Sequence, residues 1–417
     1  MASVGMSSMR LLYVTNTSIS LSETFISHLL DGLSRAGHEV VFACPPGRVP
    51  EIPGVRVQQL ETDWRVLSRP SARMLLKAAF GAAWQHRRVS MRQSRARRNL
   101  ASLGRAVRPD IVVFDYGTTA AACHRWAMAE GLPFVVLING YDASSALADR
   151  GYAEALSQAC SSSLLTVAPC GHLARRLRLI GVPAERLEVI PYSPDYDRIG
   201  RVSHVAEVPG RVASLGRLHP QKCPVALVHM MDELRREAPG AELMVIGDGP
   251  SRGEAERAIS RLGLVNHVKL LGSMEHERAL EVMASASVFV QHSVTTDFGD
   301  QEGFPVALAE AAAMGKAIVS TVHSGIPENV VDGETGFLVQ EHDFPGHARR
   351  VAQLLQDDSL RRRMGEAARQ RIRTICPPHA RAERLIQAIG DRLSATRAYR
   401  DRSETRSPFF IGQRQPV

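Results

Sequence analysis

The sequence contains no apolar stretch long enough to cross a membrane. Its most apolar runs, residues 111–114 and 134–138, have the length of a β-strand, whereas a spanning helix needs about 20 residues. The first residues also lack the pattern of a signal peptide, because Asn16 and Ser18 interrupt the short apolar run that follows Arg10. We therefore expect a globular protein of the cytoplasm, with at most a peripheral contact to the inner face of the membrane.

Cysteine is also scarce, and its spacing excludes the common cysteine-based sites. None of the six cysteines forms a Cys-x-x-Cys pair, and none combines with histidines at zinc-binding spacing. We predict that all six are buried, reduced thiols. They lie at positions 44, 123, 160, 170, 223 and 376.

The net charge is +8, and nearly all of the excess of Lys and Arg lies in residues 1–200. No zinc-finger or RNA-recognition signature accompanies this charge, so we expect no nucleic-acid partner. Much of it belongs to residues 71–108, where Arg88, Arg92 and Arg95 fall on one helical face. Two interpretations stay open for this segment: a solvated surface helix, or a contact with an anionic membrane or a lipid-diphosphate acceptor.

Short apolar runs alternate with helix-length segments along most of the chain. This alternation is typical of α/β domains with parallel sheets. The rhythm stops at the prolines of residues 191–209 and then restarts. Strands are predicted at residues 10–16, 39–44, 110–115, 134–138, 164–168 and 187–190, and then at 211–215, 242–246, 267–271, 288–291 and 317–320.

We therefore predict two doubly wound, Rossmann-like domains that face each other across a cleft, because open parallel sheets bind ligands beyond the carboxyl ends of their strands. The expected divisions are an N-terminal domain (1–190), a connector (191–209), a C-terminal domain (210–376), a helix that packs back on the N-terminal domain (377–400) and a loose tail (401–417).

The most informative segment runs from Asp300 to Gly315, directly after a predicted strand. Pro305 suits the first turn of a helix and Gly315 its end. Backbone N–H groups of residues 303–306 would then form an anion site at a helix N-terminus. Glu302 and Glu310 are too far apart to grip one small group, but they can hold two parts of a longer ligand.

A second segment with ligand-binding character follows the predicted strand 211–215. Gly216 allows the backbone to approach a ligand closely, and Arg217 and Lys222 emerge at the carboxyl end of the strand. Two cations at this position suit a diphosphate, since a hydrogen bond to a charged group contributes about 1.5–3 kcal/mol.

Several ordered motifs resemble those of the retaining glycosyltransferases of family four, which have the GT-B fold. They cover about residues 210–340, and the first half resembles exopolysaccharide-building members more loosely. The matching segments are Glu302-x7-Glu310, Gly216-Arg217 with Lys222, Gly247-Asp-Gly-Pro250, Gly325-Ile-Pro-Glu328, Asp332-Gly-x-x-Gly-Phe337, Ser22-Glu-Thr-Phe-Ile26 and Asn139-Gly-Tyr-Asp142.

The resemblance implies a hexosyltransferase that moves a sugar from a nucleoside-diphosphate donor to a glycan, lipid-linked or small-molecule acceptor without a metal or other cofactor. Arg217 and Lys222 would bind the diphosphate, and Glu310 the ribose hydroxyls. Glu302 with the backbone at Gly303, Phe304, Pro305 and Val306 would hold the donor sugar, and the loop with Gly272 and Met274 would contact the base. The family usually has histidine where this chain has Asn139, which we expect to orient the donor sugar.

Single motifs also suggest other functions. Asp195-Tyr-Asp197 has the form of a metal site, but it resembles the ordinary interdomain turn of the family, so we predict no metal there. The glycines at 247, 249 and 253 miss the spacing of a dinucleotide fingerprint by one residue, which argues against a dehydrogenase.

A sugar phosphorylase of the same architecture and a catalytically silent nucleotide-sugar binder remain as alternatives. The segment Gly325–Glu328 is as compatible with a simple helix start as with a functional role.

Overall fold

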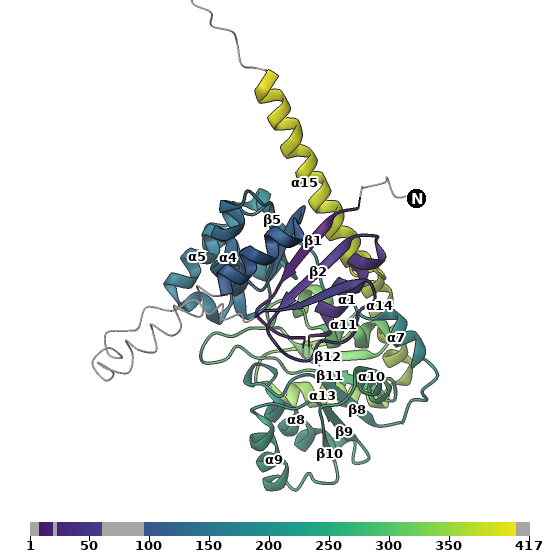
Figure 1. Cartoon of the computed structure of the whole chain (residues 1–417). Helices are drawn as coiled ribbons and strands as arrows, with labels where there is room; N and C mark the ends of the chain where they lie inside the picture. Colours follow the sequence, from purple (N-terminus) through teal and green to yellow (C-terminus); the bar gives the residue numbers. More distant parts are fainter. Residues whose placement is uncertain (1–7, 20–22, 61–95, 406–417) are drawn as a thin grey trace, which may run out of the picture.

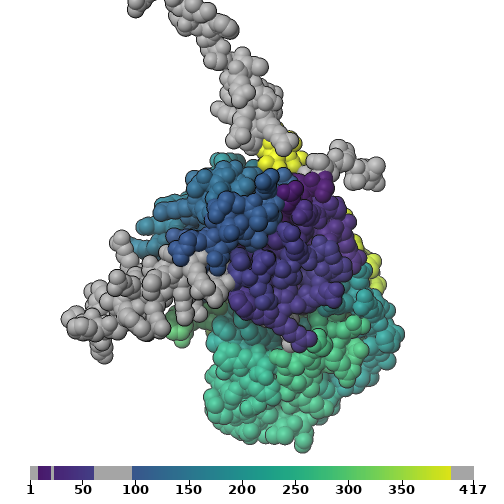
Figure 2. Space-filling model, in the orientation of Figure 1, coloured from purple at the N-terminus to yellow at the C-terminus, as the bar shows by residue number. Residues whose placement is uncertain are grey.

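The computed structural model describes residues 8–19, 23–60 and 96–405, with only the backbone described for residues 396–405. Two domains lie one above the other, the N-terminal domain in purple and blue and the C-terminal domain in green (Figures 1 and 2). None of the described helices combines the length and the apolar character that crossing a bilayer requires.

The N-terminal domain is built on a fully parallel seven-stranded sheet of order β3-β2-β1-β4-β5-β6-β7. Its strands are β1 (Arg10–Val14), β2 (Glu39–Cys44), β3 (Val55–Gln59), β4 (Ile111–Asp115), β5 (Phe134–Leu137), β6 (Leu165–Ala168) and β7 (Leu187–Val189). Its described helices include α1 (Thr24–Arg35), α4 (Gly117–Ala129), α5 (Arg150–Ser162) and α6 (Gly171–Leu179). The central strands are buried on both faces, which explains their continuous apolar sequences.

The C-terminal domain has a parallel six-stranded sheet of order β10-β9-β8-β11-β12-β13. Its strands are β8 (Arg211–Leu215), β9 (Glu242–Ile246), β10 (Val268–Gly272), β11 (Val288–Val290), β12 (Ala317–Thr321) and β13 (Phe337–Val339). Its helices are α8 (Pro224–Glu237), α9 (Arg252–Arg261), α10 (His276–Ala284), α11 (Val306–Ala313), α12 (Ile326–Asn329), α13 (Phe344–Gln356) and α14 (Asp358–Ile375). The strand order reverses between β8 and β11, where a doubly wound sheet binds its ligand.

Two segments of chain connect the domains. The first is residues 191–209, where the predicted connector contains a short helix, α7 (Tyr196–Arg201). The second leads from α14 to α15 (Ala380–Thr405), which packs against α1 of the N-terminal domain. A Cβ at Gly32 would lie 2.8 Å from the Cβ of Ala382, so this close helix packing requires glycine on α1.

The structure confirms the predicted fold class, and every predicted strand is present with shifts of at most two residues. Strands β3 and β13 were not predicted. Helix α15 continues to Thr405, so the prediction of a loose tail from residue 401 was wrong for its first five residues. All six cysteines are free, and all but Cys223 are fully buried.

The basic segment is described only from residue 96 onward; Arg88, Arg92 and Arg95 lie outside the described residues. Residues 96–107 are helical, and Arg97, Arg98 and Arg105 are exposed on that helix while Leu100 is buried. This part of the segment is therefore a solvated helix face, and membrane contact by the remainder stays a prediction.

The C-terminal domain also buries a pair of histidines against each other. Nδ1 of His292 lies 2.9 Å from Nδ1 of His347, and Nε2 of His292 accepts a hydrogen bond from the backbone N–H of His342 at 3.0 Å. Burial lowers the pKa of His292 to about 4, and it also holds the pKa of His347 well below its usual value. Both rings are therefore neutral in the folded protein at neutral pH.

Acidification should destabilise the C-terminal domain through this pair. The unfolded chain takes up a proton at His292 near pH 6.5, whereas the folded domain does so only near pH 4, so the unfolded state binds more protons between these values. The contribution of neutral His292 to the free energy of unfolding is fully present above pH ~6.5, and its loss lowers that free energy by about 3 kcal/mol toward pH 4. Denaturant titrations at pH 7 and 4.5 should show a smaller loss in His292→Gln than in the parent. The exposed His204→Gln should behave as the parent; an unchanged pH dependence in His292→Gln would show the prediction to be wrong.

Candidate active site

The candidate site lies in the cleft at the point where the strand order of the C-terminal sheet reverses. Lys222 closes a short helical turn, η4 (Pro220–Lys222), after β8, and Glu302 lies in the loop between β11 and α11. Nζ of Lys222 and Oε2 of Glu302 form an ion pair in which both side chains are largely buried. The structure thus brings together two residues that are 80 positions apart in the sequence.

Arg217 lies in the same cleft but is exposed to solvent. Burial and, after it, the Arg217 cation lower the pKa of His219, while the carboxylate of Asp300 opposes them. Nδ1 of His219 lies 3.9 Å from Oδ2 of Asp300. Arg217 is therefore close to the loop that carries Glu302, with its guanidinium group accessible to a ligand.

Helix α11 supplies the second glutamate and an N-terminus that opens toward the cleft. Pro305 occupies the N-cap position, and Gly303 and Phe304 precede it as buried residues. Glu310 is only 2% exposed, and its Oε1 lies 2.8 Å from Nε2 of His276 at the start of α10. Burial lowers the pKa of His276, but the Glu310 carboxylate outweighs this effect, so the pKa is raised.

The base-binding loop predicted around Gly272 and Met274 lies next to His276. Gly272 ends β10 with φ of 76°, a conformation that favours glycine, and its carbonyl accepts a hydrogen bond from the N–H of Gly247 at 2.9 Å. Met274 is half-buried against the core. His276, which follows this loop, contacts Glu310 on α11, so the loop and Glu310 lie close together.

The N-terminal domain closes the site from the other side with the turn after β5. A Cβ at Gly140 would lie 2.9 Å from the carbonyl oxygen of Gln301 and 3.2 Å from the nitrogen of Gly303. Any side chain at position 140 would therefore push the two domains apart. Ser144 strengthens the contact by donating a hydrogen bond to Asp300 at 3.2 Å.

Asn139 does not present a free side chain to the cleft. Its Nδ2 donates to Oδ1 of Asp115 at 3.1 Å, and its Oδ1 accepts from the hydroxyl of Tyr192. Asp115 also accepts from Tyr13 at 2.6 Å, and Asp142, whose pKa burial raises to about 7, accepts from the backbone N–H of Asn139 at 2.9 Å. These bonds fix the turn that carries Asn139, and the expectation that Asn139 orients the donor sugar stays a prediction.

Two residues near the site were missed by sequence analysis as functional candidates. His323 accepts a hydrogen bond from the backbone N–H of Glu302 at 2.9 Å and contacts Glu341 at 2.6 Å, so it orients the Glu302 loop. His276 orients Glu310. Neither histidine carries a sequence signal, because each depends on a partner brought near by folding.

Glu328, from the segment Gly325–Glu328, has a role between the domains. Short helix α12 does begin here, but the Glu328 carboxylate accepts hydrogen bonds from the N–H groups of Gly171 and His172 at 2.7 and 2.8 Å. These groups belong to the N-terminus of α6 in the other domain, where a carboxylate is favoured by the helix dipole. Glu328 therefore contributes to holding the cleft in its present width.

Comparison with known proteins agrees with this geometry. Residues 197–371 match the family described as glycosyl transferases group 1, and residues 22–193 match the family described as glycosyl transferase 4-like domain. The chain is thus similar to the group 1 glycosyl transferases over residues 197–371 and to the glycosyl transferase 4-like domain over residues 22–193. The two domains that form the cleft are thus each matched by one glycosyl transferase family, the N-terminal domain by the second and the C-terminal domain by the first.

Among similar proteins, a Salmonella typhimurium protein named for colanic acid biosynthesis, the glycosyltransferase WcaL, is 30% identical over 58% of this chain and 60% of its own. A Mycolicibacterium smegmatis GDP-mannose-dependent α-(1-6)-phosphatidylinositol monomannoside mannosyltransferase is 31% identical over 52% of this chain and 59% of its own. The match thus spans about three fifths of the length of these curated relatives.

Solved structures show the same fold over nearly the whole chain. HepE of Anabaena, in complex with UDP and glucose, has a TM-score of 0.70 at 15% identity and covers 92% of this chain and 99% of its own. The sucrose-phosphate synthase of Thermosynechococcus elongatus has a TM-score of 0.69 at 18% identity, with 93% and 100% covered. The predicted GT-B fold is therefore confirmed.

Removing the side chain of Asn139 should slow turnover much more than it weakens donor binding. Asn139→Ala leaves Asp115 and Tyr192 without their shared partner and loosens the turn that faces the donor, so we expect a fall in kcat of about 10- to 100-fold. The melting-temperature shift produced by the donor should change little. Tyr192→Phe, which removes only the hydroxyl that binds Asn139, should give a weaker form of the same effect. Parent-like turnover in Asn139→Ala would exclude any role of this position.

Proposed function

We propose that this chain is a retaining glycosyltransferase that moves a hexose from a nucleoside-diphosphate-sugar to a glycan, lipid-linked or small-molecule acceptor. The observation that carries the proposal is the Lys222–Glu302 ion pair at the strand-order reversal of one domain, opposite the Gly140 turn of the other. This arrangement places a cation, a carboxylate and a helix N-terminus around one point in a cleft between two domains. A diphosphate and its attached sugar require that combination.

The ion pair suggests how the site exchanges partners when a donor binds. In the structure, Glu302 neutralises Lys222, so neither charge is left unpaired in a partly dry cleft. A diphosphate would take over Lys222 together with the exposed Arg217, and the released Glu302 carboxylate would accept hydrogen bonds from sugar hydroxyls. Glu310 would do the same for the ribose, while Gly303, Phe304 and Val306 offer backbone N–H groups.

The chemistry then needs stabilisation of the leaving group. As the bond from the anomeric carbon to the diphosphate breaks, negative charge grows on the diphosphate oxygens, next to Arg217 and Lys222. Preorganised charges of this kind are often the largest contribution to catalysis. The acceptor oxygen forms its new bond on the face that the diphosphate leaves, its proton passes to a departing diphosphate oxygen, and the configuration is retained. Because two cations already meet the diphosphate, we propose that the reaction needs no metal.

The relatives suggest an acceptor class. WcaL is named for colanic acid biosynthesis, an Erwinia amylovora relative for amylovoran biosynthesis, and the mycobacterial relative for a phosphatidylinositol mannoside. We propose a growing polysaccharide or lipid-linked acceptor used at the cytoplasmic face of the membrane. All three of these relatives are named as transferases, so they give no support to the sugar phosphorylase alternative.

Replacing either cation of the diphosphate site should strongly reduce turnover. Arg217→Ala or Lys222→Ala removes a charge from the leaving group, and we expect kcat to fall on the order of 100-fold or more. The assay is donor turnover with a panel of nucleotide-sugars. Lys269→Ala is the matched control, because this exposed lysine of the same domain pairs with Glu242 on the sheet edge. Full activity in both single variants would remove the diphosphate site from the proposal.

Excess chelator should leave most of the activity in place, measured well below the melting temperature. The physical reason is that Arg217 and Lys222 supply the charge that magnesium would otherwise bring to the diphosphate. Complete loss that magnesium or manganese restores would contradict metal-independent transfer, and it would direct attention back to Asp195 and Asp197.

A further inference from the structure

A cavity of about 710 Å³ opens on the side of the molecule where the chain passes between the domains. Its walls come from α1, from residues 193–201 of the connector, from the start of α10 and from residues 378–382 before and within α15. It is lined by both polar and apolar groups. The proposed donor residues Arg217, Lys222 and Glu302 do not line it, and His276 is the residue that it shares with the surroundings of Glu310.

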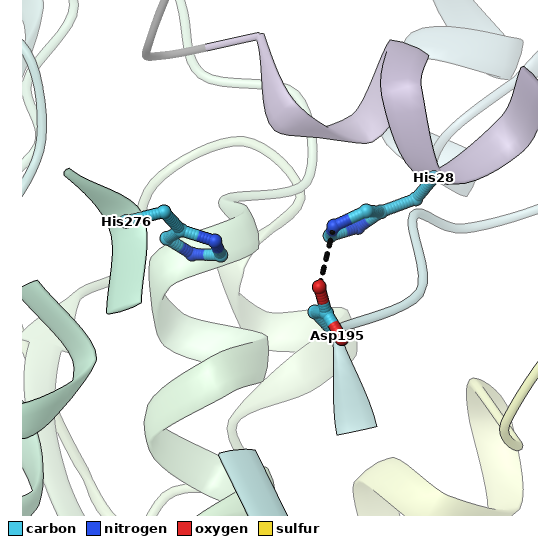
Figure 3. A group of neighbouring side chains, drawn as sticks. All are labelled: His28, Asp195 and His276. Atoms are coloured by element: carbon cyan, nitrogen blue, oxygen red, sulfur yellow. Dashed lines mark ion pairs between the residues drawn. The ribbon is translucent and has the colours of Figure 1, made fainter. Parts of the chain in front are cut away.

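Three side chains of the types that bind metal ions, two histidines and one aspartate, converge at this cavity, each from a different element. His28 comes from α1, Asp195 is the N-cap residue of α7, and His276 begins α10. Their candidate ligand atoms all lie within 4.8 Å of one another. In Figure 3 the two imidazole rings and the carboxylate point toward a common centre.

Each histidine can turn one ring nitrogen toward a metal, and at His276 this nitrogen, Nδ1, now contacts the guanidinium group of Arg198. Nε2 of His28 lies 2.9 Å from Oδ2 of Asp195, but without hydrogen-bond geometry, and neither ring nitrogen of His28 has a hydrogen-bond partner among the described residues. His276 uses Nε2 to contact Glu310, which directs Nδ1 away from that carboxylate. A carboxylate behind the second nitrogen is the usual support of a metal-bound histidine.

We propose that His28, Asp195 and His276 bind one divalent transition metal ion of the zinc class, with solvent from the cavity as the fourth ligand. Two imidazoles and one carboxylate are a ligand set that zinc accepts in tetrahedral geometry. Ligand atoms of such a site are roughly 3.4 Å apart, given metal–ligand distances of about 2.0–2.1 Å. The present separations need only small side-chain movements to reach it.

The guanidinium group of Arg198 lies where a metal ion would bind in this cluster. Its guanidinium group lies 3.2 Å from Asp195 and 3.0 Å from Nδ1 of His276, and its side chain is 41% exposed. A metal ion would have to displace it, and the exposed side chain can move into solvent. Arg198 and the metal therefore compete for the same two residues, which provides a sharp test.

Metal binding here would act on the relation between the domains. The ion would tie α1 of the N-terminal domain to α7 of the connector and to α10 of the C-terminal domain. Through His276 it would also fix Glu310, the residue that we propose binds the ribose. No step of sugar transfer requires the ion, so its effect should appear in stability and in domain orientation.

The test uses the full chain, stripped with chelator and dialysed, with zinc chloride as the probe. We expect one zinc per chain by elemental mass spectrometry and a rise in Tm of at least about 3 °C at zinc about 100-fold above Kd. Cobalt should give the intense visible absorption of a tetrahedral site. Absence of stoichiometric zinc together with an unchanged Tm would overturn the proposal.

Variants decide which residues bind the ion. His28→Gln and Asp195→Asn should each weaken zinc binding at least about tenfold. If His28→Gln fails to fold, Asp195→Asn still provides the test, because asparagine can also cap the N-terminus of α7. Arg198→Ala should tighten binding, because it removes the competing cation. His204→Gln, an exposed histidine nearby in the chain, should bind as the parent does. Zinc binding that survives both ligand variants, or that weakens in Arg198→Ala, would show that the ion binds elsewhere.

Discussion

The close backbone approach between Gly140 and residues 301–303 sets the geometry of the whole cleft. There is no space for a Cβ at this contact, so the two domains can come this near only because residue 140 is glycine. The Glu328 carboxylate at the N-terminus of α6 adds a second fixed contact across the same cleft. Together they place a turn of one domain directly opposite the Lys222–Glu302 pair of the other.

Charges in the cleft are arranged in pairs that a ligand can separate. Lys222 is matched by Glu302 and His276 by Glu310, so that buried charge is compensated in the structure as it stands. Arg217 is the exception, since it remains exposed. A donor with a diphosphate, a sugar and a ribose can provide a new partner for each of these groups.

His28, Asp195 and His276 form a polar cluster where the chain connects the two domains, and His276 links this cluster to Glu310 in the cleft. His276 contacts Glu310 on one side and faces His28 and Asp195 on the other. Arg198 contacts His276, which contacts Glu310, so a single imidazole ring separates Arg198 from the carboxylate that we propose binds the ribose. This short path couples the orientation of the domains to the donor site.

The fold class and all central strands could be predicted from the sequence, because buried parallel strands are continuous apolar runs. The sequence also points to Arg217, Lys222, Glu302 and Glu310 as donor residues, since these spacings are local, and their roles remain a proposal. It did not predict β3, an edge strand with the mostly polar sequence VRVQQ, or β13, which has only three residues. Three contacts became visible only in the folded chain: Asn139 with Asp115 and Tyr192, Glu328 with the N-terminus of α6, and Asp195 with His28 and His276. Each of these depends on side chains from distant parts of the chain, and no local pattern records which of them folding brings together.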